Sequence, residues 1–199
     1  MFSNVYKNKT ILITGHTGFK GSWLSIWLTS LGAKVVGVSI NIPSTPSNFS
    51  ASRITDVIED HRIDIRDSDA IRSLIVSSQP DYVFHLAAQA LVVPSYSNPL
   101  DTFSVNALGS ASVLDALRSL NKKVIAIMIT SDKAYDNVEW VWGYRETDRL
   151  GGKDPYSASK GMAELVIRSY VESFFNSSNS NIRIGIARAG NVIGGGDWA

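Results

Sequence analysis

The chain has 199 residues, of which 44% are hydrophobic, and this is enough for one domain with a buried core. Nineteen basic and eighteen acidic side chains leave a net charge of +1, so no overall field would attract nucleic acid or an anionic membrane. The lack of cysteine excludes disulfides, thiolate catalysis and cysteine-bound zinc, and with neither a signal peptide nor an apolar span in the sequence we expect a cytoplasmic protein.

Short apolar runs alternate with stretches of helical periodicity along most of the chain. Strands are predicted at 10–14, 34–39, 57–64, 81–86, 123–130 and 182–188. Helices are predicted at 21–31, 68–78, 98–119 and 156–175. Such alternation is typical of βαβ units, so we predict an α/β fold with a doubly wound parallel sheet.

Several residues mark the ends of these elements. Gly32 suits the end of the first helix, and Asp67 and Asp69 favour the start of the second. Residues 41–52 are rich in Pro, Ser and Asn and predict a surface loop after the second strand.

The chain ends in a loop-like stretch, residues 194–199, that begins with three glycines. It follows the last predicted strand closely and leaves no helix to complete the last βαβ unit. We therefore expect a dinucleotide-binding and catalytic domain at 1–190, followed at 191–199 by the start of a truncated substrate-binding region. The smaller C-terminal substrate domain would then be missing.

A glycine-rich loop joins the first strand to the first helix. Its residues are Gly15, His16, Thr17, Gly18, Phe19, Lys20 and Gly21. Gly15 allows a tight turn, Gly18 lets backbone approach a pyrophosphate, and Gly21 lets the helix pack closely on the sheet. The anion would bind unpaired N–H groups at the helix N-terminus. Glycines that merely turn the chain are the alternative, and the flanking strand and helix argue against it.

Asn41 occupies the position after the second strand where an acidic residue would accept hydrogen bonds from the adenosine ribose. An Asn side chain also bonds a ribose hydroxyl. No Arg follows closely to bind a 2′-phosphate, so we predict NAD rather than NADP as the cofactor, with no metal.

Two further strand ends would complete the cofactor site. Asp64 and Ile65 follow the third strand and would hold the adenine through a carboxylate and a backbone N–H, although an ordinary strand-end carboxylate is an equally good interpretation. Small residues after the fourth strand would let the cofactor lie against backbone at Leu86, Ala87 and Ala88. His85 is interpreted as a packed structural residue.

Tyr156 and Lys160 lie four residues apart, so they share one face of a helix. A tyrosine, whose ordinary pKa is about 10, is a poor base at neutral pH. A nearby ammonium and a positive nicotinamide ring would favour the phenolate, which takes a proton from a substrate hydroxyl as hydride leaves. Lys160 would also hold the nicotinamide ribose. A surface pair on an amphipathic helix is the alternative.

The fifth predicted strand ends in Ser131, Asp132 and Lys133, where open α/β sheets place their working residues. A hydroxyl there would orient the substrate, and Asp132 and Lys133 add an acid and a base. A solvated ion pair at the start of a loop is the alternative interpretation.

Five stretches spread over nearly the whole chain carry a family resemblance: TGHTGFKGSWLS, TSDKAYDN, WVWGYRE, YSASKG and RAGNVIGGGDWA. Together they resemble the nucleotide-sugar 4,6-dehydratases of the extended short-chain dehydrogenase/reductase family, in particular those that act on CDP-glucose. The resemblance implies a Rossmann-like domain with an NAD that is reduced and reoxidised within one turnover. It also implies a homodimer formed by the long helices at 98–119 and 156–175.

The resemblance implies a role for each catalytic residue. Tyr156 would deprotonate the sugar C4 hydroxyl as hydride leaves C4, and Ser131 would bond the C4 oxygen. Asp132 would protonate the departing C6 hydroxyl. Lys133 stands where related dTDP-glucose dehydratases carry Glu, and we predict that it acts as the C5 base or as a C5/C6 proton shuttle. A lysine does so where burial and neighbouring positive charge keep its amine unprotonated.

Three polar residues would line the sugar or its phosphate by the same resemblance: Gln89, Ser95 and Asn191. Val93 departs from the family, because related sequences commonly carry a basic residue near that position. A group of aromatic residues would form a lid over the site or, equally well, a hydrophobic patch on the sheet edge: Trp140, Trp142 and Tyr144, with Glu146 at its base.

Two other functions remain open. A nucleotide-sugar epimerase or an inverting UDP-sugar 4,6-dehydratase shares Tyr156 and Lys160, but an epimerase returns hydride to C4 and has no use for Asp132 and Lys133. A non-catalytic NAD-binding module would have no need of an intact Ser131. For the 199-residue chain alone we expect little or no turnover.

Overall fold

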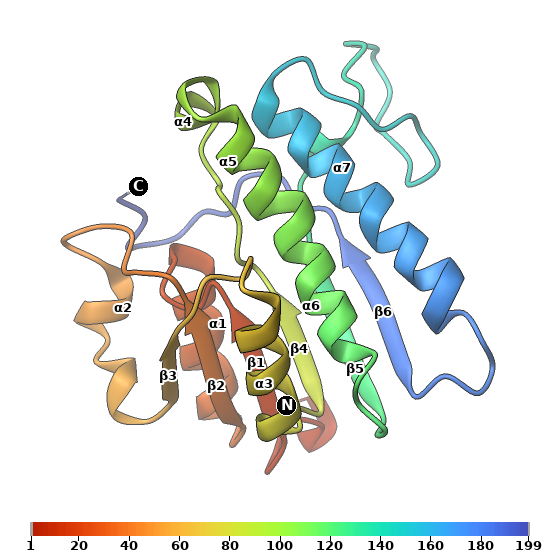
Figure 1. The fold of residues 1–199 in the computed structure, drawn as a ribbon. Coiled ribbons are helices and arrows are strands. Elements are labelled where there is room, and N and C mark those ends of the chain that lie inside the picture. The colour runs from red at the N-terminus through yellow and green to blue at the C-terminus, as the bar shows by residue number, and fades with distance from the viewer. Residues whose placement is uncertain (1, 199) are drawn as a thin grey trace.

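The computed structural model describes residues 2–198 and is built on one six-stranded parallel sheet (Figure 1). The strands are β1 (Thr10–Thr14), β2 (Lys34–Ser39), β3 (Glu59–Arg62), β4 (Tyr82–His85), β5 (Val124–Ile129) and β6 (Ile182–Ala187). Their order is β3-β2-β1-β4-β5-β6, so the chain winds outward from β1 in both directions. The predicted doubly wound α/β fold is confirmed.

Helices cover both faces of the sheet. They are α1 (Phe19–Ser30), α2 (Asn48–Ala51), α3 (Ser68–Ser78), α4 (Val92–Ser97), α5 (Pro99–Phe103), α6 (Gly109–Leu117) and α7 (Pro155–Tyr170). Shorter 3-10 and π turns are η1 (Phe2–Asn4), η2 (Ile54–Asp56), η3 (Ser104–Leu108), η4 (Asp132–Ala134) and η5 (Val171–Phe175). In Figure 1, α3, α6 and α7 lie in front of the sheet and α1 lies behind it. Within residues 2–198, none of the helices has the length and apolar character needed to cross a bilayer.

Alternate residues of β1 point to opposite faces and enter two separate cores. Leu12 joins the larger cluster, which includes residues of α3, α6 and α7. Ile11 and Ile13 join the smaller one, which packs on Leu28 of α1. Both faces of the central strands are thus buried, which is why their sequences are continuous apolar runs.

The long helix expected at 98–119 is interrupted by the π turn η3 between α5 and α6. Pro99 lies in the first turn of α5, where a missing N–H does no harm. The π turn contains Asn106, which is buried. The helical prediction is confirmed over residues 99–117, but the π turn within this run was not predicted.

Residues 41–52, predicted as a loop, contain the short helix α2. The Ser47 side chain caps it by accepting a hydrogen bond from the Ser50 N–H at 3.1 Å. Phe49 is buried and meets the His16 ring edge-on, with ring centroids 5.2 Å apart. The predicted end signals are present elsewhere: Asp67 caps α3, and Gly32 follows α1 with a φ of +83°.

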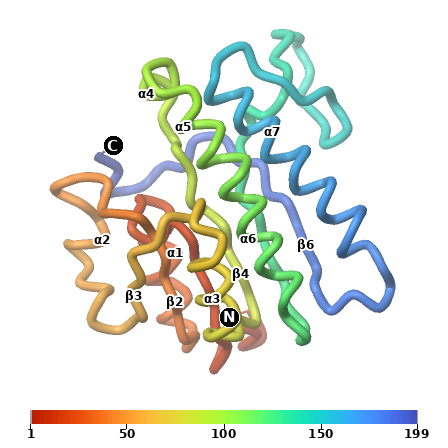
Figure 2. The backbone as a smooth tube through the Cα atoms, viewed as in Figure 1, coloured from red at the N-terminus to blue at the C-terminus, as the bar shows by residue number. Residues whose placement is uncertain are grey.

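The segment after β6 runs back across the carboxyl ends of the strands towards α1 and α2 (Figure 2). The indole N–H of Trp23 in α1 donates to the carbonyl of Gly195 at 2.8 Å. The glycine loop therefore lies near the C-terminal segment, and the two enclose one end of the sheet.

Candidate active site

The glycine loop turns sharply between β1 and α1. Gly15 has a φ of +75°, and a Cβ there would lie 2.7 Å from the backbone nitrogen of Ala87. A Cβ on Gly21 would collide with the Gly15 carbonyl and the His16 backbone. Gly18 caps α1 without a side chain, so the first N–H groups of the helix face outwards. The loop thus has the shape that an approaching pyrophosphate requires.

Two side chains of this loop point into the protein. His16 is fully buried, with Nε2 2.9 Å from Asp60 Oδ1 and Nδ1 3.0 Å from Ser39 Oγ. Burial lowers the pKa of His16, and the Asp60 carboxylate opposes that effect without cancelling it. The Thr17 hydroxyl donates to the Asn41 carbonyl at 2.6 Å. The cofactor contact predicted for His16 would therefore come from its backbone. The Thr17 N–H already donates to Ser39 Oγ at 3.3 Å, so the contact predicted for Thr17 would require that hydrogen bond to be exchanged.

A cavity of about 430 Å³ opens beside the loop at the carboxyl ends of β4 and β5. Its lining is mainly apolar: Phe19, Lys20, Trp23, Leu24, Leu86, Ile129, Ala189, Val192, Ile193 and Gly194. It lies where the winding of the sheet reverses beside β1, and open α/β sheets bind their ligands at that point. Phe19, Lys20 and Leu86, predicted to bind the cofactor, meet in this cavity.

Both residues predicted to hold the adenine, Asp64 and Ile65, already contact other side chains or backbone of the protein. Arg66 binds the Asp64 carboxylate through Nε at 3.0 Å and Nη2 at 2.6 Å, and this hydrogen bonding lowers the pKa of Asp64. The Ile65 side chain is buried against Gly109. A cofactor contact by Asp64 stays a prediction, and it would have to share the carboxylate with Arg66.

His85, at the end of β4, is buried, and both of its ring nitrogens form hydrogen bonds. The Ser110 hydroxyl donates to the Asn106 carbonyl at 2.7 Å, so it must accept from His85 Nε2, 3.0 Å away. Nδ1 is then the acceptor for the Thr14 hydroxyl at 2.7 Å. Burial, helped by the Lys160 charge, lowers the pKa of His85 to about 3. The interpretation of His85 as a packed structural residue is confirmed.

Tyr156 and Lys160 lie in the first half of α7, and both are buried. Asp154 caps this helix by accepting from the Ser157 N–H at 2.9 Å. Lys160 Nζ lies 5.8 Å from the centre of the Tyr156 ring. Burial lowers the pKa of Lys160 to about 8, and the charge of Lys20 adds to this effect. The surface-pair alternative is wrong, because both side chains are buried.

Burial raises the pKa of Tyr156, against the expectation that its surroundings favour the phenolate. A hydrogen bond with Ser131 and the positive charge of Lys133 oppose this rise. Asp132 and Asp154 reinforce it. The chain's own residues therefore keep Tyr156 a phenol at neutral pH.

Ser131, Asp132 and Lys133 form one turn at the end of β5. Ser131 Oγ accepts from the Lys133 N–H at 3.2 Å and donates to Asp132 Oδ1 at 3.1 Å. Lys133 Nζ lies 3.3 Å from Asp132 Oδ2, and about half of each side chain is exposed. The structure thus brings these residues together beside Tyr156, with the acid and the amine already paired in a half-exposed position.

Two of the residues predicted to contact the sugar, Gln89 and Ser95, already form hydrogen bonds within the protein. The Gln89 amide donates to the Leu91 carbonyl at 2.9 Å and to Thr102 Oγ1 at 3.0 Å. Ser95 is fully buried and its hydroxyl donates to the Val92 carbonyl at 2.6 Å. Asn191 lies exposed in the segment after β6. Sugar contacts by Gln89 and Ser95 stay predictions that require these hydrogen bonds to be exchanged.

The predicted aromatic group is only partly assembled. Tyr144 stacks on Tyr135, which follows η4, with ring centroids 5.0 Å apart, and Trp140 lies 5.3 Å from Tyr144. Trp142 is 72% exposed and lies outside this stack. The stack joins the loop to the turn that carries Asp132.

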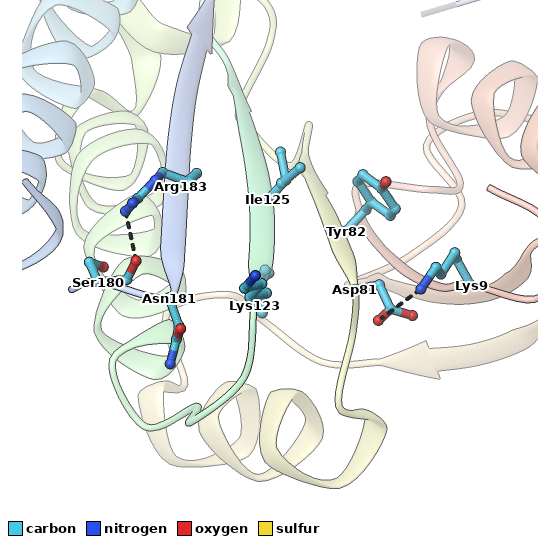
Figure 3. A pocket seen from close by; sticks show the side chains of 9 residues that line it. Lys9, Asp81, Tyr82, Lys123, Ile125, Ser180, Asn181 and Arg183 are labelled. Atoms are coloured by element: carbon cyan, nitrogen blue, oxygen red, sulfur yellow. Dashed lines mark hydrogen bonds and ion pairs between the residues drawn. The ribbon is translucent and has the colours of Figure 1, made fainter. Parts of the chain in front are cut away.

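A second hollow lies at the opposite ends of the strands (Figure 3). Its polar groups bond each other: Lys9 Nζ is 3.9 Å from Asp81 Oδ1, and Arg183 donates to the Ser180 carbonyl at 2.7 Å. It lies at the amino ends of β4, β5 and β6, so it is not part of the candidate site.

A family model described as GDP-mannose 4,6 dehydratase matches residues 12–184 of the chain. The chain belongs to this family. A CDP-glucose 4,6-dehydratase of Salmonella typhimurium is 49% identical over 199 residues, which cover 98% of this chain and 55% of that protein.

Solved structures of epimerases share the fold. The epimerase Mth375 of Methanothermobacter thermautotrophicus superposes with a TM-score of 0.80 at 27% identity, over 98% of this chain and 55% of that one. A UDP-glucose 4-epimerase of Thermus thermophilus in complex with NAD gives a TM-score of 0.75 at 25% identity, over 90% and 54%. The chain thus spans about half the length of these proteins.

Sequence reasoning missed two charged residues at the site of this dehydratase-family chain. Glu164 lies on α7 one turn beyond Lys160, and Arg188 directly follows β6. They form a buried ion pair, with Arg188 Nε 2.8 Å from Glu164 Oε1. The spacing of four residues from Lys160 was the only available signal for Glu164.

Proposed function

We propose that this chain carries the cofactor-binding and catalytic part of an NAD-dependent nucleotide-sugar 4,6-dehydratase, a lyase that converts CDP-glucose into CDP-4-keto-6-deoxyglucose. The observation that carries the proposal is the meeting of Tyr156 on α7 with Ser131 and the Asp132–Lys133 pair at the end of β5. The identity of 49% with a CDP-glucose 4,6-dehydratase supports this substrate.

The residues at the loop fit a dinucleotide. Gly15 lies against the Ala87 backbone where any side chain would intrude, and α1 begins without a side-chain cap. The apolar cavity beyond it would take the nicotinamide ring, and the buried Lys160 ammonium would lie within reach of its ribose. A bound NAD would supply the hydride chemistry at C4 and C6 and the positive charge of its oxidised ring.

Tyr156 and Ser131 would act at the C4 oxygen. Because burial raises the pKa of Tyr156, positive charge brought beside it would be needed for the phenol to lose its proton to solvent, and the resulting phenolate would take the proton of the C4 hydroxyl. The Ser131 hydroxyl, already hydrogen-bonded in this corner, would orient the C4 oxygen. The proton taken by Tyr156 would not go back to the C4 oxygen, because the product keeps its C4 ketone; it would balance the proton that leaves C6 with the water.

Asp132 and Lys133 would act at C5 and C6. A C4 ketone makes the C5 proton acidic, and water is then lost across C5 and C6. Asp132 would protonate the leaving C6 hydroxyl, and Lys133 would take the C5 proton or pass it on, with a proton returning to C5 by the same route when hydride reaches C6. Because the two side chains lie 3.3 Å apart, a single proton can move between them.

We further propose a cytoplasmic homodimer that serves polysaccharide biosynthesis. The outer surfaces of the α5–α6 run and of α7 carry exposed apolar residues that pairing would cover: Leu100, Leu108, Met162 and Leu165. The lack of cysteine supports a reducing compartment.

The substrate and the reaction are tested together on the product of the complete gene. CDP-glucose, dTDP-glucose and UDP-N-acetylglucosamine are supplied separately with NAD, and products are analysed by mass spectrometry. We expect loss of one water from CDP-glucose, with Tyr156→Phe as the inactive control. An isomer of unchanged mass would indicate an epimerase, loss of water from the UDP-sugar would indicate the inverting dehydratase, and NAD binding without NADH formation would indicate a binding module.

A further inference from the structure

We infer that Glu164 is a positioning residue, which fastens α7 to the ends of β5 and β6 and so fixes Tyr156 and Lys160 relative to Ser131. The inference rests on the proposed function. Glu164 itself lies behind the candidate site and is 2% exposed, so it acts through the groups that it holds.

Glu164 lies on the same face of α7 as the catalytic pair, four residues after Lys160 and eight after Tyr156. Its carboxylate accepts three hydrogen bonds. Thr130 Oγ1 lies 2.5 Å from Oε1, Arg188 Nε lies 2.8 Å from Oε1, and Arg188 Nη2 lies 3.0 Å from Oε2. The side-on pairing with Arg188 allows one orientation only, so it fixes the helix in rotation as well as in distance.

The partners of Glu164 lie beside the catalytic turn. Thr130 immediately precedes Ser131, and its N–H donates to the Ala187 carbonyl at 3.0 Å. The Asp132 N–H donates to the Ala189 carbonyl at 3.1 Å. Arg188 therefore lies between two backbone hydrogen bonds that join the chain after β5 to the chain at the end of β6.

Arg188 also reaches the loop on the far side of the site. Its Nη1 donates to the Glu146 carbonyl at 3.2 Å, and its guanidinium lies 4.6 Å from the centre of the Tyr135 ring. Tyr135 stacks with Tyr144. One buried carboxylate thus joins α7, the two strand ends and the aromatic loop.

General stability does not account for this arrangement. A buried ion pair is commonly no more stabilising than well-packed apolar residues of the same volume, because both charges lose their water. What the pair supplies is a defined geometry, and geometry matters most where reacting groups must meet within a fraction of an ångström. Glu164 lies one turn from Lys160 and bonds Thr130, the residue before Ser131, and this assigns the geometry to the site.

The test uses the hydroxyl of Thr130 in the product of the complete gene. Thr130→Val keeps the side-chain shape but removes the hydrogen bond to Glu164, and Thr130→Ser keeps the hydroxyl. We expect kcat of Thr130→Val to fall about tenfold per folded molecule with KM for CDP-glucose unchanged, because small displacements of reacting groups lower rates strongly. The isotope effect with substrate deuterated at C4 should rise, and Thr130→Ser should restore both.

A second measurement does not depend on turnover. The phenol of Tyr156 is titrated by ultraviolet absorbance, as the difference between each protein and its Tyr156→Phe counterpart. Ser131, Asp132, Lys133, Asp154 and Lys160 are the polar and charged groups around this phenol. Removing the Thr130 hydroxyl should loosen Ser131 and raise the pKa of Tyr156 further.

The two measurements separate the two proposals. If wild-type protein does not convert CDP-glucose but the Tyr156 titration shifts in Thr130→Val and returns in Thr130→Ser, the proposed function fails and the positioning role stands. If Thr130→Val merely melts at a lower temperature, with wild-type kcat per folded molecule and an unchanged titration, Glu164 is a structural residue and the inference is overturned.

Discussion

Lys160 is a buried cation that the fold tolerates at a cost in stability. The difference between its ordinary pKa of 10.5 and its value of about 8 corresponds to about 3 kcal/mol. Below pH 8 the amine is protonated in both the folded and the unfolded chain, so the penalty is present in full. Between pH 8 and 10.5 the folded chain loses the proton first, and the penalty disappears as the pH rises.

We therefore expect Lys160→Met to be more stable than wild type at pH 7 by up to about 3 kcal/mol, although inactive. The advantage should shrink by pH 9.5. Urea unfolding at both values measures it, with Met in place of the exposed Lys153 as the control that leaves stability unchanged. Equal stability of wild type and Lys160→Met at pH 7 would show that burial does not perturb this amine.

Lys133 differs from Lys160 because it is half-exposed and paired with Asp132. If Lys133 carries the C5 proton, Lys133→Ala should slow exchange of that proton with solvent by about a hundredfold or more, in line with what general acid–base catalysis contributes. Hydride transfer from C4 should continue. Nuclear magnetic resonance of the sugar in heavy water follows the exchange, and an ordinary exchange rate in Lys133→Ala would exclude the role.

The contrast between these lysines and Glu164 shows what residue patterns reveal. Tyr156 and Lys160 were found because a known chemistry gives meaning to their spacing. Glu164 looked like any charged residue on a helix, because its partners Thr130 and Arg188 directly follow two strands that are distant from it in sequence. A buried charge with distant partners is visible only once the chain has folded.

At the scale of elements, β1 and β2 were predicted at their observed bounds because burial on both faces makes them continuous apolar runs, whereas the charged, exposed β3 was predicted four residues too long. Short helices were missed for local reasons. α2 was hidden by the Pro and Ser around it, and α4 begins with two β-branched residues and a proline. Each of these helices buries one side chain, Phe49 in α2 and Ser95 in α4.

The π turn η3 has a structural use that its sequence does not disclose. It turns Asn106 so that Oδ1 accepts from the Gln89 N–H at 2.8 Å and Nδ2 donates to the Gln89 carbonyl at 3.0 Å. Nδ2 also donates to Ser159 Oγ on α7 at 2.7 Å. The loop after β4 is thereby joined to the helix that carries Tyr156.

We expect Asn106→Ala to lower the free energy of unfolding by about 3 kcal/mol, because each buried polar group left without a partner costs about 1–3 kcal/mol. Ser112→Ala is the control, since that hydroxyl bonds only the Leu108 carbonyl of the same helical run, at 3.1 Å. Thermal and urea unfolding measure both variants. A loss no larger than that of Ser112→Ala would mean that water replaces the amide.

At the scale of the whole molecule, one end of the sheet gathers the glycine loop, the apolar cavity and the catalytic turn. This convergence follows from topology, because the carboxyl ends of parallel strands share one edge and β1 lies where the winding reverses. The residues proposed to bind the cofactor therefore all belong to this chain. Binding of NAD can accordingly be separated from turnover.

We expect the 199-residue chain to bind NAD, and Gly15→Ala to abolish that binding. Alanine at this position would need a φ of +75° and would place its Cβ 2.7 Å from the Ala87 nitrogen, so the turn would have to open where the pyrophosphate lies. Gly143→Ala is the matched control, because nothing lies within 4 Å of the Cβ that it adds. Titration calorimetry with NAD measures both. Wild-type affinity in Gly15→Ala would place the dinucleotide elsewhere on the sheet, and with it the site proposed for the sugar.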